Sequence, residues 1–489
     1  MEKEKQSGKQ PGEAAPRPQC PVYRKCGGCQ LQNMEYARQL SYKQGQVQKL
    51  LGGFGRVQPI LGMENPYHYR NKVQAAFGTD RRGKIISGVY QSSTHRIVPV
   101  DSCLTEDETA DRIIGTIRQM MPSFHLTAYD ERTGRGFLRH VLVKRGFSTG
   151  EVMVVLVAAT PVFPGKNHFI AELRRRHPEI TTLVLNRNDA FTSMVLGEKE
   201  TVLFGPGYIR DTLCGMTFRI SPKSFYQINP VQTEVLYREA IRQCRFTGEE
   251  TVLDAYCGTG TIGLIASSGV RRVTGVEINR DAVRDARRNA RENGVENAEF
   301  FCADAGEWML QAAGEGYAPD VVMMDPPRAG SSREFLAALL TVKPERIVYI
   351  SCNIETQARD LRILTQGGYQ VRRIQPVDMF PHTSHVETVV LLSKGEIDSK
   401  KVRVEFSLEG MDMSGFQKGA TYEQIKAYVL KHTGLKVSSL YISQVKRKCG
   451  LDVGQNYNLS KKENAKVPQC PPEKEAAIVE ALKYFQMLE

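Results

Sequence analysis

The sequence predicts an α/β protein in which the second half of the chain forms a doubly wound, largely parallel sheet. After Phe225, short apolar runs alternate with stretches of helical periodicity, which is the rhythm of βαβ units. A glycine-rich segment at 254–263 follows the first of these runs and opens a helix. Before Phe225, β-type runs bounded by Gly, Asp and Asn predominate and predict a mostly antiparallel region.

The first half begins with a predicted helix from Glu35 to Leu51, which ends at Gly52 and Gly53. Helical periodicity also predicts helices at 109–121 and 166–176. Short runs rich in β-branched and aromatic residues predict strands at 72–77, 85–90, 95–100, 137–143, 151–158, 182–185 and 194–196.

The second half carries the strands of the doubly wound sheet, predicted at 251–255, 272–277, 298–302, 321–324, 346–351, 371–376 and 386–392. Helical stretches such as 281–293 lie between them, as parallel pairing requires. We expect the final apolar run, 386–392, to supply the antiparallel edge that mixed sheets often carry.

Composition divides the chain into four parts. Residues 1–19 lack Leu, Ile and Val and are predicted to be a disordered tail. Residues 20–224 hold a cysteine cluster and the β-rich region, and residues 225–395 hold the doubly wound sheet. Residues 396–489 are a predicted helical extension, in which 421–424 form a capping box, a second helix begins near 438–439 and a third follows 471–472.

At 41% hydrophobic and 25% charged, the composition is typical of a globular protein. No apolar run reaches the roughly 18 residues that a membrane-spanning helix needs, so we expect no membrane partner. The net charge of +12 favours a polyanionic partner. Eleven cysteines without a secretory signal predict a reducing compartment, the cytoplasm, and favour metal or catalytic roles over disulfides. We expect a monomer.

The glycine-rich segment from Asp254 to Gly263 predicts a nucleotide-type cofactor site, because glycines let the backbone turn tightly beneath a nucleoside. Glu277 ends the next strand, where a carboxylate can accept both ribose hydroxyls. These two signals fit a dinucleotide-binding dehydrogenase equally well. Asp325-Pro-Pro separates the classes, because it stiffens a loop beside a transferable group, which a dehydrogenase does not need. A glycine turn without a ligand explains only one of the three signals.

Cys352 follows the apolar run 347–350, so it falls at the carboxyl end of a predicted strand, where open α/β sheets bind ligands. A thiol there predicts covalent catalysis beside S-adenosylmethionine. A thiolate added to C6 of uracil makes C5 nucleophilic toward the sulfonium methyl, and a base then removes the C5 proton. Glu387, at another late strand end, is the predicted base. The plainer alternatives are that Glu387 is a solvated carboxylate and that Cys352 is a small buried residue without a chemical role. We place Cys214, Cys244, Cys257 and Cys302 in that second class.

From Cys20 to about Leu392 the chain resembles the RNA 5-methyluridine methyltransferases, which methylate C5 of uracil in 23S rRNA or tRNA. The resemblance rests on the cysteine cluster and on the segments 65–72, 224–227, 254–263, 325–328, 351–353 and 385–387. It implies a Rossmann-like S-adenosylmethionine methyltransferase domain behind a cluster-bearing, mostly β domain. It also implies that Cys352 is the nucleophile and Glu387 the proton acceptor. The implied cofactor contacts are Gln227, Tyr256, Glu277 and Asp325, with Thr261 and Asp304 at family positions that vary.

The cysteine cluster consists of Cys20, Cys26 and Cys29, with Cys103 far downstream. Four thiolates suit zinc or an iron–sulfur cluster, and the spacing lacks the two Cys-x2-Cys pairs usual for structural zinc. Ribosomal members of the family hold a [4Fe–4S] cluster with matching spacing, so the resemblance implies the same cluster here, in a structural or RNA-folding role. Unliganded buried cysteines are the alternative.

The resemblance implies an RNA partner, and the cysteine cluster favours 23S rRNA, with tRNA as the second substrate. Ribosomal members often begin with an RNA-binding β-barrel, for which the residues before Cys20 are too few. We expect the basic run 446–448 of the extension to serve either as a replacement RNA contact or as a solvated helix end. Phe380 is a predicted stacking surface, and the predicted phosphate contacts are Arg70, Lys72, Arg139, His140 and Lys144.

Two functions of other classes stay open on the sequence. An iron–sulfur NAD-dependent oxidoreductase would use the same glycine turn, but that function gives Asp325, Cys352 and Glu387 no role. A catalytically silent RNA-binding protein leaves Cys352 and Glu387 unexplained in the same way.

Overall fold

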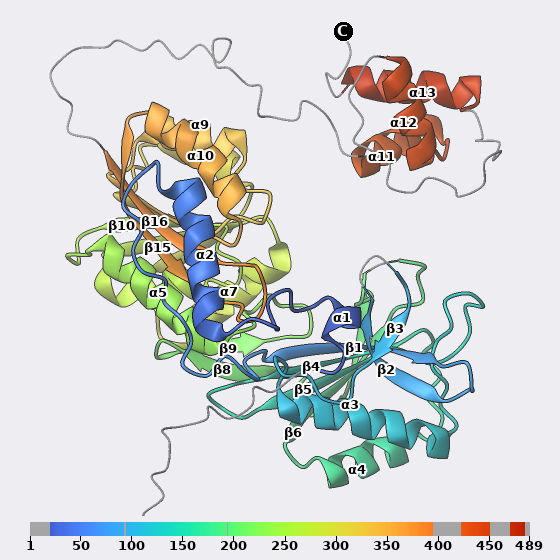
Figure 1. Cartoon of the computed structure of the whole chain (residues 1–489). Coiled ribbons are helices and arrows are strands. Elements are labelled where there is room, and N and C mark those ends of the chain that lie inside the picture. Colours follow the sequence, from blue (N-terminus) through green and yellow to red (C-terminus); the bar gives the residue numbers. More distant parts are fainter. Residues whose placement is uncertain (1–19, 92–93, 193, 395–421, 450–469, 485–489) are drawn as a thin grey trace, which may run out of the picture. The chain divides into compact units, whose positions relative to one another are not determined.

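The computed structural model describes residues 20–91, 94–192, 194–394, 422–449 and 470–484. The chain divides into two units, residues 1–397 and 398–489 (Figure 1). Each unit has a hydrophobic core of its own. The predicted tail 1–19 and the first capping-box residue, Thr421, lie outside the described residues.

A seven-stranded sheet forms the β-rich part of the first unit, in the order β3-β2-β1-β4-β5-β6-β7. Neighbouring strands are antiparallel except β5 and β6, which are parallel because helix α4 (Lys166–Arg176) connects them. Helix α3 (Glu108–Met120) and α4 cover one face (Figure 1). The strands are β1 (Lys72–Thr79), β2 (Ile85–Tyr90), β3 (Ile97–Pro99), β4 (Leu138–Arg145), β5 (Val152–Ala158), β6 (Ile180–Arg187) and β7 (Lys199–Phe204).

The central strands of this sheet are buried on both faces. Along β5, Val152 and Val154 join the core under α3 and α4, whereas Met153 and Val155 join the core of the doubly wound part. The alternation is the two-residue period of a pleated strand. Burial on both faces explains why this strand reads as a continuous apolar run.

The predicted strand at 194–196 is wrong. Among the described residues, this segment is a loop, and the Asn188 side chain donates to the carbonyls of Met194 at 2.7 Å and Val195 at 3.0 Å. These bonds satisfy carbonyls that a strand would have to pair with a neighbour. The structure instead forms β7 beyond this loop and a hairpin of β8 (Ile209–Leu213) and β9 (Met216–Ile220), none of which the sequence pattern assigned.

The second sheet has the order β12-β11-β10-β13-β14-β16-β15, and its first five strands are parallel. This confirms the predicted doubly wound α/β class. The strands are β10 (Thr251–Ala255), β11 (Arg272–Glu277), β12 (Ala298–Cys302), β13 (Val321–Met324), β14 (Arg346–Ser351), β15 (Tyr369–Val377) and β16 (Glu387–Lys394).

The antiparallel strand is β16, but it does not form the edge. It lies between β14 and β15 and is antiparallel to both. Val389, Val390 and Leu392 of β16 are fully buried, whereas β15 exposes Gln370 and Arg372. The more polar strand therefore takes the edge, where one side faces water.

Helices flank the second sheet on both faces. Helix α2 (Tyr36–Leu51), which comes from the start of the chain, packs against α10 and β15 (Figure 1). Helix α5 was not predicted, although Asn229 at its N-cap and Pro230 at its first turn are typical start signals. The other helices are α1 (Tyr23–Cys26), α5 (Pro230–Cys244), α6 (Thr261–Ala266), α7 (Arg280–Glu292), α8 (Ala305–Gly314), α9 (Arg333–Val342) and α10 (Ile354–Gln366), with 3₁₀ turns at Met121–Phe124 and Ser267–Gly269.

The second unit is a bundle of three helices, α11 (Tyr422–Thr433), α12 (Ser439–Lys448) and α13 (Pro472–Tyr484). Their core contains apolar side chains from all three helices, among them Val429, Ile442 and Ile478. Ser438 caps α12 by accepting a hydrogen bond from the backbone of Tyr441, in agreement with the predicted helix start.

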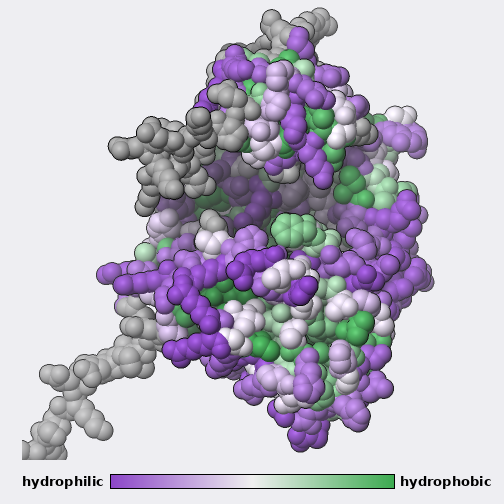
Figure 2. Space-filling model, turned by 90° about the vertical axis from the view of Figure 1, so that its right-hand side faces the viewer, coloured by the Kyte–Doolittle hydropathy of each residue, from purple (hydrophilic) through white to green (hydrophobic). Residues whose placement is uncertain are grey.

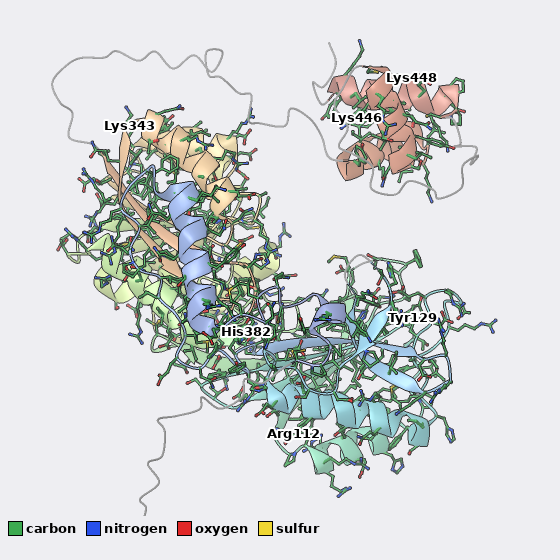
Figure 3. All side chains as sticks on the ribbon, in the orientation of Figure 1. Arg112, Tyr129, Lys343, His382, Lys446 and Lys448 are labelled. Carbon is green, nitrogen blue, oxygen red and sulfur yellow. The ribbon has the colours of Figure 1, made fainter. Side chains whose placement is uncertain are left out.

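The basic run at the end of α12 is largely engaged within this bundle (Figure 3). The Lys446 ammonium lies 5.1 Å from the centre of the Tyr422 ring, and Lys446 is buried. Lys448 pairs with Glu475 at 2.7 Å. These contacts favour the helix-end interpretation of the run over a phosphate-binding surface.

Hydrophilic residues predominate on the face shown in Figure 2, where hydrophobic side chains surface only in small groups. Within the described ranges, no helix is long and apolar enough to span a bilayer.

Candidate active site

The glycine-rich segment between β10 and α6 is folded around two carboxylates. The backbone N–H of Gly263 donates to Asp254 at 2.8 Å, and that of Gly258 donates to Glu277 at 3.1 Å. Gly260 has a φ of +80°, and a Cβ there would lie 2.8 Å from the Phe300 ring, so no larger residue fits. The sequence therefore builds the tight turn that the glycine spacing predicts.

Tyr256 is the one non-glycine residue of this turn with a left-handed backbone, at a φ of +63°. Its hydroxyl lies 3.0 Å from that of Ser331, which fixes the side chain across the carboxyl ends of β10 and β13. Strained backbone of this kind concentrates at functional sites.

The two weaker cofactor candidates have structural tasks. Asp304 caps α8 by accepting the backbone N–H groups of Gly306 at 2.8 Å and Glu307 at 3.1 Å. Thr261 opens α6, and its hydroxyl lies 3.3 Å from that of Thr259. Their contact with a cofactor stays a prediction.

Gln227 is held from two sides. Its carbonyl accepts the Asn71 side chain at 3.2 Å, and its own side chain hydrogen-bonds the hydroxyl of Tyr237 on α5. Burial, and then the neighbouring Asp325, raise the pKa of Tyr237, so this residue is a neutral donor. Asn71 and Tyr237 were not singled out from the sequence, because their partners are distant in the chain.

Carboxylates with raised pKa values gather at these strand ends. Burial raises the pKa of Asp254 to about 7, with further contributions from Asp325 and Glu277. Burial likewise raises the pKa of Asp325 to about 7. A cationic ligand would favour the ionised forms of Asp254 and Asp325 and so lower their pKa values. These strand ends therefore suit a positively charged molecule.

Cys352 and Glu387 meet because of the strand register. Ser351 at the end of β14 pairs with Thr388 of β16, so the next residues along each strand, Cys352 and Glu387, come together. Burial raises the pKa of the Cys352 thiol to about 11, and the charges of Glu387 and Asp325 add to this effect. These two residues therefore belong to one site with Asp325.

Arg328 was not among the predicted site residues. Its guanidinium hydrogen-bonds the Cys352 thiol and lowers the pKa of both Cys352 and Glu387, against the effect of burial. The position three residues after Asp325 in the same stiff loop is the sequence signal that would have found it.

Glu387 is buried, and its Oε2 atom has no hydrogen-bond partner among the described residues. Burial, and then Asp325, raise its pKa well above the ordinary value, while Arg328 opposes the shift. A buried carboxylate oxygen without a partner is uncommon, and it is free to accept a proton from a ligand.

A cavity of about 290 Å³ opens beside these groups and is lined by Cys352, Arg328 and His385. Its other wall comes from helix α2, through Tyr42 and Gln46. The volume is close to the lower end of the range for small-molecule sites, roughly 300–1,000 Å³.

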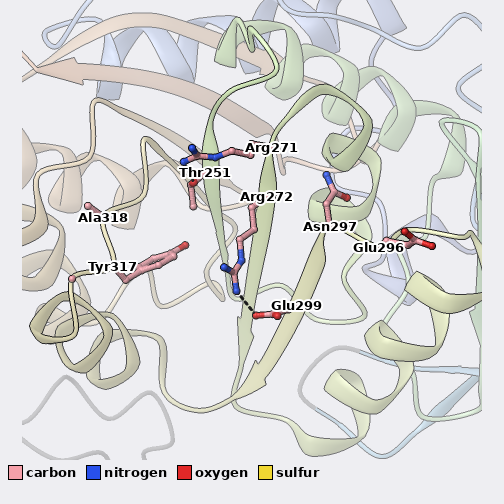
Figure 4. Close-up of a pocket in the computed structure, with 9 residues that line it drawn as sticks. Thr251, Arg271, Arg272, Glu296, Asn297, Glu299, Tyr317 and Ala318 are labelled. Atoms are coloured by element: carbon pink, nitrogen blue, oxygen red, sulfur yellow. Dashed lines mark hydrogen bonds and ion pairs between the residues drawn. The ribbon is translucent and has the colours of Figure 1, made fainter.

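A larger cavity, of about 600 Å³, lies at the amino ends of the strands, where Thr251 begins β10 and Arg272 begins β11 (Figure 4). An ion pair of 2.6 Å joins Arg272 to Glu299 across it. No cysteine is among the described residues that line it. The larger of these two cavities is therefore not the one that holds the candidate nucleophile.

The four cysteines of the predicted cluster are neighbours. Burial raises the pKa of Cys29 to about 11, and the Cys26 and Cys20 thiols contribute to the shift. Cys29 and Cys103 both hydrogen-bond the Thr105 hydroxyl, the latter at 3.4 Å. The donor set thus has the chemistry of an iron–sulfur site. Among the described residues, however, no group of three or more Cys, His, Asp or Glu side chains has the spacing of a metal site.

Three of the predicted phosphate contacts are wrong, because β4 is buried on both faces. Arg139 donates to the carbonyls of residues 188 and 190, each at 2.8 Å. Lys144 donates to the carbonyls of Ser221 at 2.8 Å and Ser224 at 2.9 Å. His140 is also buried, and burial lowers its pKa to about 4. Arg139 and Lys144 therefore fix loops instead of facing solvent.

Comparison with known proteins gives the chain a family. Residues 35–395 match the family model described as tRNA (Uracil-5-)-methyltransferase. An uncharacterized RNA methyltransferase of Oceanobacillus iheyensis is 46% identical over 382 residues, which cover 77% of this chain and 83% of the relative. Another, from Halalkalibacterium halodurans, is 44% identical over 378 residues, with 76% and 82% covered.

Among solved structures, the tRNA (uracil-54, C5)-methyltransferase of Pyrococcus abyssi in complex with S-adenosyl-L-homocysteine is similar, with 30% identity and a TM-score of 0.64. The match covers 75% of this chain and 85% of that one. Fold and site therefore define an S-adenosylmethionine-dependent α/β methyltransferase. The chain belongs to the RNA uracil-5-methyltransferase family. Residues 396–489 lie outside the family match.

Proposed function

We propose that this protein methylates C5 of a uridine in RNA, with Cys352 as the nucleophile and Glu387 as the base. The observation that carries the proposal is that the Cys352 thiol and Arg328 line one small cavity, while the buried Glu387, whose Oε2 atom has no partner among the described residues, lies next to Cys352. The dimensions of the cavity suit a single nucleoside, which RNA-modifying enzymes take out of the base stack.

The reaction divides between the two residues. The Cys352 thiolate adds to C6 of uracil, and the electrons of the C5–C6 double bond move toward O4. S-Adenosylmethionine, when bound, supplies an electrophilic methyl group that C5 attacks. Glu387 then removes the C5 proton, the C5–C6 double bond re-forms and the Sγ–C6 bond breaks. A carboxylate with a raised pKa is a stronger base, so the burial of Glu387 favours this last step.

Electrostatic effects support roles for Arg328 and for the cofactor carboxylates in this scheme. The Arg328 guanidinium favours the thiolate of Cys352, whose pKa is otherwise raised. Gln227, Tyr256, Glu277 and Asp325 are our proposed contacts to S-adenosylmethionine, and Asp325 places negative charge near the positive sulfonium. The oxidoreductase alternative fares worse, because buried carboxylates repel the anionic pyrophosphate of NAD.

For the substrate, we propose 23S rRNA, bound by a monomer. Support comes from the cysteine set at 20, 26, 29 and 103, which resembles that of the ribosomal members of the family. The β-rich region 20–224 is the proposed RNA-binding part. The similarity to an archaeal tRNA methyltransferase favours tRNA as the second candidate.

We also propose that Cys20, Cys26, Cys29 and Cys103 hold a [4Fe–4S] cluster. The neighbouring positions of these thiols support it, although their spacing would have to tighten around the irons. Anaerobic reconstitution with iron and sulfide should give a broad visible absorption band in the wild type and in a control variant, Cys302→Ser. Cys103→Ser should lose it. Zinc in the purified protein, or reconstitution unaffected by Cys103→Ser, would contradict the proposal.

The decisive experiment uses RNA that contains 5-fluorouridine. Fluorine does not leave as a cation, so a methylated covalent adduct should accumulate through Cys352 and be visible as a gel-shifted, denaturant-stable species. Cys352→Ala should form none, whereas Cys302→Ser should match the wild type. An adduct formed by Cys352→Ala would reject the assignment of the nucleophile.

With ordinary uridine, Glu387→Gln should transfer the methyl group and then stall as an enzyme–RNA adduct, because C5 keeps its proton. Normal turnover of this variant would remove Glu387 from the role of base.

The substrate is identified by mapping 5-methyluridine in the rRNA and tRNA of a strain that lacks this protein. Loss of a methyl group from 23S rRNA is the expected result. Loss from tRNA alone would favour the second candidate.

A further inference from the structure

One face of helix α2 lines the cavity of Cys352. Tyr42, Gln46 and Leu50 all border that cavity, and their spacing of four residues puts them in a row along one side of the helix. The family model includes this helix, but nothing in the catalytic scheme above uses these residues. The row therefore forms one wall of the substrate cavity. The roles of the nucleophile, the base and the cofactor contacts do not explain why these three residues line it.

The neighbouring row of α2 fixes the helix to the catalytic loop. Gln39, Lys43, Val47 and Leu51 are buried. The Lys43 ammonium contacts Asp378 at 2.5 Å and the Phe380 carbonyl at 3.0 Å, and the Tyr36 hydroxyl donates to Asp378 at 2.8 Å. His382, beside this end of α2, contacts the Gln39 side chain at 3.1 Å (Figure 3). Since this loop leads into β16 and Glu387, the wall and the base are held in one rigid frame.

The exposed row has the chemistry to hold a nucleotide. Tyr42 is 41% exposed, so its ring is accessible to a ligand, whereas Gln46 and Leu50 are half-buried. An exposed aromatic ring stacks on unpaired bases, which is how single-stranded RNA is commonly recognised. An amide side chain offers both a donor and an acceptor, so Gln46 can pair with the polar edge of a base.

We propose that helix α2 contacts the RNA substrate and contributes to its recognition. Gln46 and Leu50 line the part of the cavity that binds the target uridine. The ring of Tyr42 stacks on the unpaired base next to that uridine. This inference rests on the proposed function and names additional residues that contact the RNA. It assigns recognition of the RNA strand to a helix that begins only seven residues after the last cysteine of the 20–29 segment.

The test compares Tyr42→Ala, Tyr42→Phe and Gln46→Ala with Gln48→Ala, a matched control on the exposed side of α2 away from the cavity. The probe is a stem-loop RNA carrying the uridine located by the mapping experiment, with either an intact base or an abasic residue on each side of the target. Tyr42→Ala should raise KM for the intact RNA about tenfold, with kcat little changed. Tyr42→Phe should retain the wild-type KM, because stacking needs only the ring.

Removing the neighbouring base should weaken binding to the wild type about tenfold and to Tyr42→Ala hardly at all. Gln46→Ala should lower kcat/KM, and all four variants should bind S-adenosylhomocysteine as the wild type does. The inference is overturned if Tyr42→Ala and Gln46→Ala behave like Gln48→Ala. Failure of the wild type to form the 5-fluorouridine adduct would instead reject the proposed function, so the two failures are distinguishable.

Discussion

Asp325 shows how burial tunes single residues at this site. It is half-buried with Glu387 and Asp254 nearby, and desolvation raises its pKa to about 7. The carboxyl is therefore half-protonated near neutral pH, and its charge depends on what binds beside it.

The affinity for S-adenosylmethionine should accordingly depend on pH. The raised pKa means that Asp325 becomes neutral as the pH falls through about 7, so the cationic cofactor should bind more weakly at about pH 6 than at about pH 8. The product, S-adenosylhomocysteine, lacks the sulfonium charge and should show a weaker dependence. Isothermal titration calorimetry with both ligands measures this, and Asp325→Asn should flatten the profile for the cofactor. A profile for the cofactor no steeper than that for the product would contradict the prediction.

Arg328 should control the reactivity of Cys352. Its guanidinium lowers a thiol pKa that burial has raised to about 11, so Arg328→Ala should raise that pKa further and slow alkylation of Cys352 by iodoacetamide. Peptide mass spectrometry over a range of pH gives the rate. Cys302 is exposed and serves as the internal reference, because its labelling should not change. Equal rates for Cys352 in both proteins would exclude this role.

At the scale of elements, the main contact between the start of the chain and the catalytic loop is the buried pair of Lys43 on α2 and Asp378 after β15. Both side chains are fully buried, so the pair is shielded from water and salt. The sequence predicted the helix, since Gly52 and Gly53 mark its end. It gave no sign of a partner 335 residues away.

Lys43→Met should reduce the free energy of unfolding by about 3–5 kcal/mol, because Asp378 would be left as an unpaired buried charge. Lys43→Met combined with Asp378→Asn should recover part of the loss, since no unpaired charge remains. Urea unfolding followed by circular dichroism measures both, with Gln48→Ala as a neutral surface control. A double variant no more stable than Lys43→Met would show that the charge is not the cause.

The element scale also explains where sequence reasoning failed. The predicted phosphate contacts required the side chains of Arg139 and Lys144 on β4 to face solvent. The strand is covered on both faces, so these cations end at backbone carbonyls of neighbouring loops. Which faces are covered depends on packing between the two sheets, and a local pattern does not report it.

At the scale of the whole molecule, the family match ends at residue 395, and the three-helix bundle has a core of its own. Lys446 and Lys448, for which the sequence left open an RNA contact or a solvated helix end, engage partners inside the bundle. The bundle is therefore a compact unit with a hydrophobic core of its own.

A chain that ends at residue 397 should fold and bind S-adenosylhomocysteine with unchanged affinity, because among the described residues the first unit has hydrophobic cores of its own. Calorimetric titration of both proteins tests this, and the adduct assay with 5-fluorouridine RNA reports whether chemistry is retained. A marked loss of product affinity on truncation would show that the bundle supports the catalytic unit.

The sequence by itself determined the doubly wound class, the positions of its strands and the glycine turn, because these follow from local periodicity and backbone geometry. It also placed Cys352 and Glu387 at strand ends. Only the tertiary structure decided that β16 lies inside the sheet, that Arg328 and Tyr237 join the site, and that α2 walls the cavity. Those outcomes depend on contacts between residues far apart in the chain, which the pattern of neighbours along a sequence does not record.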